Sequence, residues 1–271
     1  MTSVSSPGTA LVTGASSGIG KVYAQRLARR GYDVLLVARD GARLEALGAD
    51  ITAKTGRKAE FLVADLGNPA DTGAVAARIA ADPAITLLVN NAGMGVERQI
   101  VGADADKVDA MVQLNVAALT RLSVAAVNAF TARGRGTLVN IASVVALIPE
   151  NFLGAYAATK AYVLALTQSL QSELKDSPVR VQAVLPGLTA TEFFDRAGMD
   201  KATLPPEMVM SAEDLVEAAL AGLDLGETIT IPALPDAADW QRLVDDRVRM
   251  APGLSLRHPA ARYGVGTAVP A

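Results

Sequence analysis

The sequence contains no cysteine, a single histidine and few aromatic residues, which make up 4% of the chain. Without cysteine the chain has neither disulfides nor thiolate metal ligands, and His258 alone does not make a zinc site, so we expect no bound metal. The residues that are plentiful are small or aliphatic: the chain is 51% hydrophobic and contains 23 glycines. This composition favours helices packed closely on a sheet.

The chain also lacks an excess of basic residues. Lys and Arg number 25 against 28 Asp and Glu, a net charge of −3, so no basic stripe is available to neutralise the phosphates of a nucleic acid. The first residues, MTSVSSPGTALVTGAS, do not resemble a signal peptide, and no run approaches the roughly 20 apolar residues of a membrane span. We therefore expect a cytoplasmic protein with neither a nucleic acid nor a membrane as its partner.

Short apolar runs alternate with longer helical patterns along most of the chain. Strands are predicted at 9–15, 33–38, 59–66, 86–93, 136–143, 180–187 and 226–234, and helices over 18–31, 40–54, 69–81, 104–133, 153–175 and 212–223. Continuous Val/Leu-rich runs separated by helices are typical of a parallel sheet covered on both faces. The prediction is a single α/β domain over 1–271, doubly wound and Rossmann-like, with a mostly parallel sheet of about seven strands.

Two segments depart from this alternation. Residues 188–210 carry Gly198, two prolines and several large apolar side chains, a composition that suits a lid over a substrate. Residues 255–271 are expected to form a loose tail. Between these segments, Ser211 with Asp214 predicts a capping box at the start of a helix.

A glycine-rich turn, TGASSGIG, joins the first predicted strand to the first helix. Glycine permits a tight turn and lets the backbone approach a pyrophosphate, whose charge is favoured at the positive end of a helix. The spacing of Gly14, Gly18 and Gly20 differs from the commonest dinucleotide fingerprint. Its position at the first strand-to-helix junction nevertheless favours a nucleotide site over a structural turn.

Tyr156 and Lys160 lie four residues apart in an alanine-rich helical run, and so on one face of the helix. A cation beside a phenol stabilises the phenolate and lowers its pKa, which suits the phenol for general acid–base catalysis. In isolation, the pair is more often a packed tyrosine with a lysine that reaches solvent. Two features favour catalysis: Ser143 ends the fifth strand, where ligand crevices of α/β sheets form, and a Pro-Gly turn ends the sixth strand beside it. Tyr23 and Tyr162 have no lysine four residues later and are interpreted as packing residues.

The chain resembles the short-chain dehydrogenase/reductase family, of the single-domain type, over roughly residues 8–190. Five motifs carry the resemblance in the family's order: TGASSGIG at 13–20, DL at 65–66, NNAG at 90–93, Ser143 with Tyr156-x-x-x-Lys160, and PGLTAT at 186–191. Asn115 also matches the family's helical asparagine. The resemblance implies an oxidoreductase that interconverts a ketone and a secondary alcohol by hydride transfer with a nicotinamide cofactor.

The resemblance also implies a role for each catalytic residue. Tyr156 exchanges a proton with the substrate oxygen, and Ser143 hydrogen-bonds the same oxygen. Lys160 binds the nicotinamide ribose, and Asn115 holds a water that links Lys160 to solvent. For Ser143 a structural capping role, and for Asn115 a structural bend in its helix, are the alternatives.

NADP(H) is predicted over NAD(H) because Arg39 follows the second strand, where an arginine pairs with a 2′-phosphate. A shift of one residue would instead place Asp40 on a ribose and favour NAD. Asp65 is expected to accept a hydrogen bond from the adenine. The full predicted cofactor set is Gly14, Ser16, Ser17, Gly18, Ile19, Gly20, Arg39, Asp65, Leu66, Asn91, Ala92, Gly93, Tyr156, Lys160, Pro186, Gly187, Thr189 and Thr191.

The substrate is expected to be an apolar or amphipathic carbonyl compound. Predicted substrate contacts are Ser143, Met94, Val145, Leu153 and Phe193, with Val96, Val144, Leu147, Phe194, Met199, Met208 and Met210 as further wall or lid candidates. A fatty 3-oxoacyl chain, a steroid-like ketone and a small aryl ketone all remain open. Other readings are a non-catalytic NADP-binding sensor, and an epimerase or dehydratase that uses the same site.

A homodimer or homotetramer is expected, because the predicted helix at 104–133 has apolar residues on more than one face. They are Met111, Leu114, Leu119, Leu122 and Val127. A helix that is apolar all round needs a further surface to cover it.

Overall fold

The computed structural model describes residues 7–95, 100–151, 154–193 and 204–265. Contacts divide the chain into two units, Met1–Pro232 and Ala233–Ala271, which are described separately. The first unit contains the sheet and every residue predicted to bind cofactor or substrate. The single-domain prediction for the whole chain stays a prediction.

A seven-stranded parallel sheet forms the centre of the first unit, in the order β3-β2-β1-β4-β5-β6-β9. Its strands are β1 (Thr9–Thr13), β2 (Asp33–Ala38), β3 (Ala59–Val63), β4 (Ile85–Asn90), β5 (Gly136–Ile141), β6 (Val179–Val184) and β9 (Ile229–Thr230). The chain runs outward from β1 to β3, then returns to the other side of β1 and runs outward again. This reversal between β1 and β4 is where open α/β sheets form a ligand crevice.

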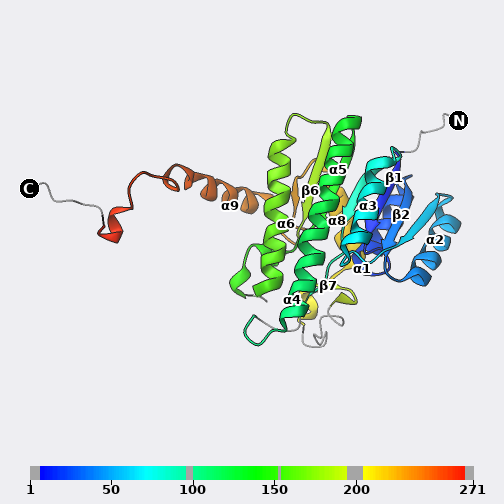
Figure 1. Cartoon of the computed structure of the whole chain (residues 1–271), viewed down its shortest axis with the longest axis horizontal. Coiled ribbons are helices and arrows are strands. Elements are labelled where there is room, and N and C mark those ends of the chain that lie inside the picture. Colours follow the sequence, from blue (N-terminus) through cyan, green and yellow to red (C-terminus); the bar gives the residue numbers. More distant parts are fainter. Residues whose placement is uncertain (1–6, 96–99, 152–153, 194–203, 266–271) are drawn as a thin grey trace, which may run out of the picture. The chain divides into compact units, whose positions relative to one another are not determined.

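Helices cover both faces of the sheet, as predicted. One core cluster joins the sheet to α1 (Gly18–Arg29), α2 (Gly41–Thr55) and α8 (Ala212–Leu225). The other joins it to α3 (Pro69–Ala81), α5 (Leu119–Arg133) and α6 (Gly154–Glu173), which Figure 1 shows on the same side of the sheet. Neighbouring strand residues divide between the clusters: Val12 packs in the first and Leu11 in the second. A strand that is buried on both faces therefore reads as a continuous apolar run.

The predicted long helix over 104–133 consists of three continuous parts: α4 (Ala105–Val112), a π-helical stretch (Gln113–Ala118) and α5. Contrary to the prediction that no segment approaches a membrane span, Ala105–Arg133 is long and apolar enough to be one. Its mean hydropathy reaches 1.5 over an 18-residue window. Length and composition are weak evidence of a span, and 44% of that window is buried inside the protein. Its contacts with α3, β4 and β5 make it a helix that covers the sheet.

Most of the apolar residues from which self-association was predicted are buried in the core of the chain itself. Met111, Leu119, Leu122 and Val127 are buried in the core, and only Leu114 keeps partial exposure. The apolar side chains that this helix does expose are Val112 and Val124. The homo-oligomer prediction stays a prediction, with these two residues as better candidates for a contact.

The ends of the predicted lid are joined to each other. Thr189–Ala190 (β7) pairs with Met210–Ser211 (β8) in a second, two-stranded parallel sheet. The backbone amide of Met210 also donates to the carbonyl of Leu188, at 2.9 Å. The capping box is confirmed in part: Ser211 Oγ accepts from the amide of Asp214 at 2.9 Å, and its hydroxyl bonds the Asp214 carboxylate at 2.7 Å. Residues 194–203 of the lid lie outside the described residues.

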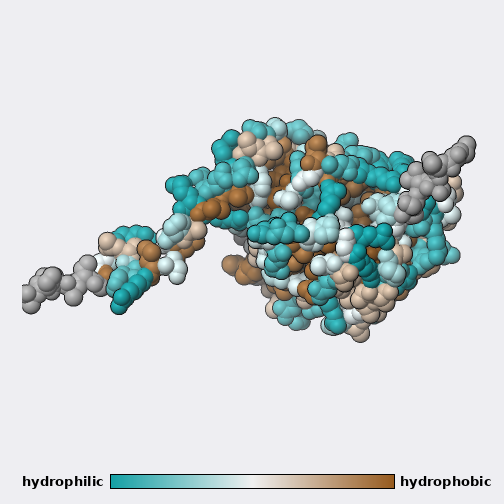
Figure 2. Space-filling view, turned by 90° about the horizontal axis from the view of Figure 1, so that it is seen from above, coloured by the Kyte–Doolittle hydropathy of each residue, from teal (hydrophilic) through white to brown (hydrophobic). Residues whose placement is uncertain are grey.

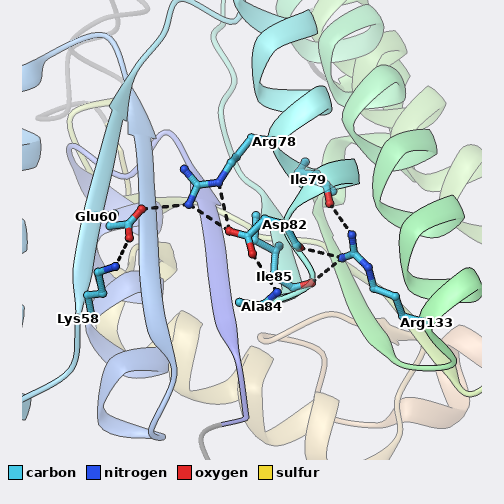
Figure 3. A network of polar contacts seen from close by, with 8 residues as sticks. All are labelled: Lys58, Glu60, Arg78, Ile79, Asp82, Ala84, Ile85 and Arg133. Carbon is cyan, nitrogen blue, oxygen red and sulfur yellow. Dashed lines mark hydrogen bonds and ion pairs between the residues drawn. The ribbon is translucent and has the colours of Figure 1, made fainter.

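A polar network ties the β3 edge of the sheet to α3 and α5 (Figure 3). Glu60 pairs with Lys58 and with Arg78, which also pairs with Asp82. Arg133 at the end of α5 donates to four backbone carbonyls at the end of α3 and before β4, those of Ile79, Ala80, Asp82 and Ile85. The last carbonyls of a helix have no amide partner within the helix and need other donors. Arg133 supplies such donors and so holds α5 to α3.

The second unit contains α9 (Ala237–Arg249), a helix that the sequence analysis did not predict. None of its residues is buried. Large apolar side chains on α9 and after it are exposed, namely Leu243, Val248, Met250, Leu254, Leu256, Tyr263 and Val265. In Figure 2 hydrophobic and hydrophilic residues alternate along this segment. The prediction of a loose tail over 255–271 stays a prediction, and its last six residues lie outside the described part.

Candidate active site

The glycine turn and the NNAG motif meet at the carboxyl ends of β1 and β4. The hydroxyl of Thr13 accepts from the amides of Asn91, at 2.9 Å, and Ala92, at 3.0 Å, and it donates to the carbonyl of Val89. In return, the side-chain amide of Asn91 donates to the carbonyl of Thr13 at 2.9 Å. The sequence predicted Asn91 and Ala92 as site residues but not Thr13, which holds both of them. Thr13 could have been recognised as the polar residue that ends an apolar strand.

The glycines of this turn are needed for different reasons. Gly14 and Gly18 have positive φ, 65° and 53°, which other residues rarely adopt. A Cβ on Gly20 would lie 2.5 Å from the Asn91 side-chain nitrogen and 2.5 Å from the Gly14 carbonyl oxygen, so only glycine fits. Ser17 is the N-cap residue of α1, so the turn lies at the positive end of this helix, where an anion is favoured. The turn therefore fits a dinucleotide pyrophosphate.

The end of β2 presents Arg39 and Asp40, both exposed. The Asp40 carboxylate caps α2 by accepting from the amide of Arg43 at 3.0 Å, and it also pairs with the Arg43 side chain. Asp40 thus caps α2. The assignment of Arg39 to a 2′-phosphate stays a prediction.

Asp65 and Leu66 follow β3, as predicted for an adenine pocket. Leu66 is buried and Asp65 is exposed. One oxygen of the Asp65 carboxylate accepts from the amide of Gly67 at 2.9 Å, which fixes the side chain. The other oxygen is available to accept from an adenine amino group.

Ser143 and the Pro-Gly turn are side by side at the ends of β5 and β6. The hydroxyl of Ser143 donates to the carbonyl of Pro186 at 3.2 Å, and the amide of Val144 donates to the same carbonyl at 3.0 Å. Ser143 Oγ also accepts from the amide of Val145 at 3.4 Å, so its alternative role as a cap is present as well. The serine is hydrogen-bonded to the Tyr156 phenol, which brings two predicted catalytic groups together.

Lys160 lies 5.7 Å from the centre of the Tyr156 ring. The lysine is buried, and its ammonium donates to the carbonyl of Ile141 at 2.9 Å. Burial lowers the pKa of Lys160 to about 8.

The expected lowering of the phenol pKa by this lysine is wrong for this structure. Protein atoms packed around the Tyr156 hydroxyl desolvate it and raise its pKa, and the hydrogen bond between Tyr156 and Ser143 only partly opposes this. Tyr156 is consequently protonated at neutral pH, which is the state required of a proton donor to a ketone.

Asn115 lies in the π-helical stretch, a feature often found at functional sites. Its side-chain oxygen accepts from the amide of Met94 at 2.9 Å, and its amide donates to the Met94 carbonyl at 2.9 Å and the Thr159 hydroxyl at 3.1 Å. A Cβ added to Gly93 would lie 3.2 Å from the Asn115 oxygen and 3.6 Å from the Lys160 nitrogen. Asn115 thus joins the NNAG loop to the helix that carries Tyr156, and the expected structural alternative is part of its role.

Of the described substrate candidates, Phe193 lies against the phenol, and Val145 and Met94 contact other residues of the site. The ring of Phe193 is 5.5 Å from that of Tyr156, Val145 is buried beside Ser143, and Met94 is held by Asn115. Val96, Leu153, Phe194 and Met199 lie outside the described residues. Of the other wall and lid candidates, Met208 is exposed to solvent, whereas Met210 is partly buried against the core. The two methionines therefore do not line one common surface.

Thr191 lies against the glycine turn: a Cβ on Gly18 would be 3.1 Å from its methyl carbon. Thr189 is buried, and its hydroxyl donates to the Gly187 carbonyl at 3.1 Å. The PGLTAT segment therefore reaches from the Ser143 side of the crevice to the start of α1. Ser16 and Ile19, the remaining predicted residues of the turn, are partly exposed beside it.

Known proteins resemble this chain in sequence. A family model described as short chain dehydrogenase matches residues 8–202. A very-long-chain 3-oxoacyl-CoA reductase of Anas platyrhynchos is 33% identical over 235 residues, which are 84% of this chain and 72% of the relative. The 17-beta-hydroxysteroid dehydrogenase type 3 of Homo sapiens is 31% identical over 185 residues, 67% of this chain and 59% of the relative.

Solved structures resemble it more closely. A short-chain dehydrogenase from Sphingobium yanoikuyae in complex with NADPH is 47% identical, with a TM-score of 0.91, and the match covers 94% of this chain and 100% of the other. A bulky-bulky ketone specific alcohol dehydrogenase from Comamonas testosteroni is 41% identical, with a TM-score of 0.87 and coverage of 94% and 98%. With the Ser143, Tyr156 and Lys160 constellation at the sheet's carboxyl edge, these matches show that the chain belongs to the short-chain dehydrogenase family and acts on CH–OH/C=O groups.

Proposed function

We propose that this dehydrogenase uses NADPH to reduce a ketone with apolar substituents to the secondary alcohol. The observation that carries the proposal is the grouping of the Tyr156 phenol with the buried Ser143 and Lys160, with the Phe193 ring against the phenol. The nicotinamide, when bound, supplies the hydride. The turn with Gly14, Gly18 and Gly20 fits its pyrophosphate, and Arg39 fits a 2′-phosphate.

The protein's own groups handle the proton and the developing charge. The Ser143 hydroxyl and the Tyr156 phenol both bond the ketone oxygen, and Tyr156 transfers its proton to that oxygen as negative charge develops there. Lys160, a buried cation whose ammonium lies near the Tyr156 ring, is the candidate to bind the ribose of the nicotinamide. Asn115 holds the NNAG loop against α6 and so keeps Tyr156 in position.

The preference for apolar ketones is supported by apolar side chains at the site. Phe193 lies against the Tyr156 ring, and the buried Val145 follows Ser143 by two residues. The relative from Comamonas testosteroni is described as specific for bulky-bulky ketones. A 3-oxoacyl thioester is the second candidate, because several curated relatives are described as very-long-chain 3-oxoacyl-CoA reductases.

The test is NADPH consumption with a diaryl ketone, a 3-oxoacyl-CoA and a small methyl ketone. We expect turnover of the diaryl ketone, with loss of at least about 10²-fold in Tyr156→Phe, because general acid catalysis contributes about 10²–10⁴-fold. NADPH binding by the variant, followed by fluorescence, should fall by far less than turnover. Cofactor binding without turnover of any carbonyl compound would favour the non-catalytic sensor, and product formation without net oxidation would favour an epimerase.

A further inference from the structure

An ion pair joins the two sides of the cofactor crevice. Arg43, in the first turn of α2, donates to both carboxylate oxygens of Glu192, at 3.1 and 2.9 Å. Glu192 follows Thr191, which lies against Gly18 of the glycine turn. The pair therefore connects the α2 side of the crevice with the start of the segment predicted to close over the substrate.

Arg43 is held by two carboxylates and remains open to solvent. Its side chain also pairs with Asp40, at 3.3 Å, and is about half exposed, as are its two partners. An exposed ion pair of this kind contributes little to stability and is readily exchanged. A guanidinium binds a phosphate through two parallel hydrogen bonds, and a phosphate carries more charge than a carboxylate.

Two arginines and two carboxylates stand at the end of β2 and on the residues paired with it. Arg39 and Arg43 contribute two positive charges, and Asp40 and Glu192 two negative ones. Asp40 is committed to capping α2. Glu192 is thus the carboxylate that an incoming dianion can replace.

We propose that Arg43 is a second specificity-determining residue for the 2′-phosphate, and that it exchanges Glu192 for this phosphate when the cofactor binds. Cofactor binding then releases Glu192 from α2. This inference rests on the proposed NADP(H) dependence. It adds a residue outside the predicted cofactor set.

The test is equilibrium binding of 2′,5′-ADP and of 5′-AMP by calorimetry, which needs no turnover. Arg43→Gln should weaken 2′,5′-ADP by about tenfold or more and leave 5′-AMP unchanged, since a hydrogen bond to a charged group is worth about that factor. Glu192→Gln removes the competing carboxylate and should tighten 2′,5′-ADP by about three- to tenfold. In the double variant, Glu192→Gln should bring no gain, because its effect acts through Arg43.

The matched control is another exposed arginine–carboxylate pair, Arg30 with Asp224, at the opposite end of α1 from the glycine turn. Arg30→Gln and Asp224→Asn should leave both ligands unaffected. Weaker 2′,5′-ADP binding by Glu192→Gln would overturn the exchange, because Glu192 would then support the phosphate site.

Failure of this inference is distinguishable from failure of the proposed cofactor. If the wild-type protein prefers 2′,5′-ADP and only Arg39→Gln removes the preference, the cofactor assignment stands and Arg43 has no part in it. If the wild-type protein binds 5′-AMP equally well, the NADP(H) assignment and the exchange both fall.

Discussion

Tyr156 and Lys160 show how burial can outweigh a neighbouring charge. Lys160 makes its hydrogen bond to the Ile141 carbonyl, while the phenol bonds Ser143. Desolvation moves both groups toward their neutral forms, so the pKa of the phenol rises and that of the lysine falls to about 8. The sequence indicated the pair and its shared helix face, but the direction of the phenol shift depends on how densely the surrounding chain packs.

The buried lysine predicts a pH-dependent stability difference. The folded protein releases the Lys160 proton near pH 8, whereas the unfolded chain keeps it to about pH 10.5. Between these values the unfolded state binds more protons, so this lysine's contribution to the free energy of unfolding rises with pH. The stability of Lys160→Met relative to wild type should therefore fall by about 2–3 kcal/mol from pH 7 to 10.5, measured by urea unfolding. The exposed Lys175→Met is the control and should show no such trend.

Tyr23 gives a second prediction at this scale. Its side chain is fully buried and its hydroxyl has no hydrogen-bond partner among the described residues, so the packing role expected for it is confirmed. Tyr23→Phe should stabilise the protein at pH 7 by about 1 kcal/mol, because an unsatisfied buried hydroxyl is removed. Thermal unfolding would measure this gain.

The stability of Tyr23→Phe relative to wild type should change with pH in the opposite direction to that of Lys160→Met. Burial raises the pKa of Tyr23, so above pH 10 the unfolded chain loses this proton while the folded protein keeps it, and wild-type stability falls. The variant's advantage should therefore grow above pH 10. Tyr162→Phe is the control, because Tyr162 is exposed, contrary to the packing role predicted for it, and bonds Thr120. An advantage that shrinks above pH 10 would contradict the assignment.

At the scale of elements, Arg133 is a fastening residue between α5 and α3 (Figure 3). Arg133→Gln removes its donors to four carbonyls and should lower the free energy of unfolding by about 1–3 kcal/mol. The exposed Arg135→Gln, two residues on, should change it by less than about 0.5 kcal/mol. Denaturant unfolding of both variants compares them directly. Equal losses would mean that the carbonyls find water as a substitute donor.

The elements themselves followed from the sequence to different degrees. Helix α3 and strand β2 have the predicted bounds, because Pro69 and the end of the DVLLVA run mark them locally. The π-helical stretch around Asn115 was not predicted, since it depends on bonds from Asn115 to Met94 and Thr159, which are distant in sequence. The β7–β8 pairing was missed for a similar reason, because it joins residues distant in sequence. Helix α9 was missed although its signal, the Asp236 cap, is local. Both lie where the alternation of strands and helices ends.

At the scale of the whole molecule, the association state tests whether the exposed apolar residues of the long helix form a contact between subunits. We expect light scattering at micromolar concentration to give a dimer or tetramer mass. Val112→Asp and Val124→Asp place charges on the exposed positions and should shift the mass toward the monomer without lowering the melting temperature of the monomer by more than about 2–4 °C. Ala158→Asp places a charge on the exposed face of the neighbouring helix α6, and its mass is compared with those of the two valine variants. A monomer mass for the wild-type chain would remove the prediction.

The two-stranded pairing of β7 with β8 has an evolutionary consequence. Because Thr189–Ala190 and Met210–Ser211 clamp the base of the intervening excursion, residues inserted into or deleted from it leave the register of the main sheet untouched. On the prediction that this segment covers the substrate, selection can change what the enzyme accepts here while the residues that hold the nucleotide and move protons stay constant. A graft of the corresponding stretch from a homologue should transplant ligand preference without loss of foldedness.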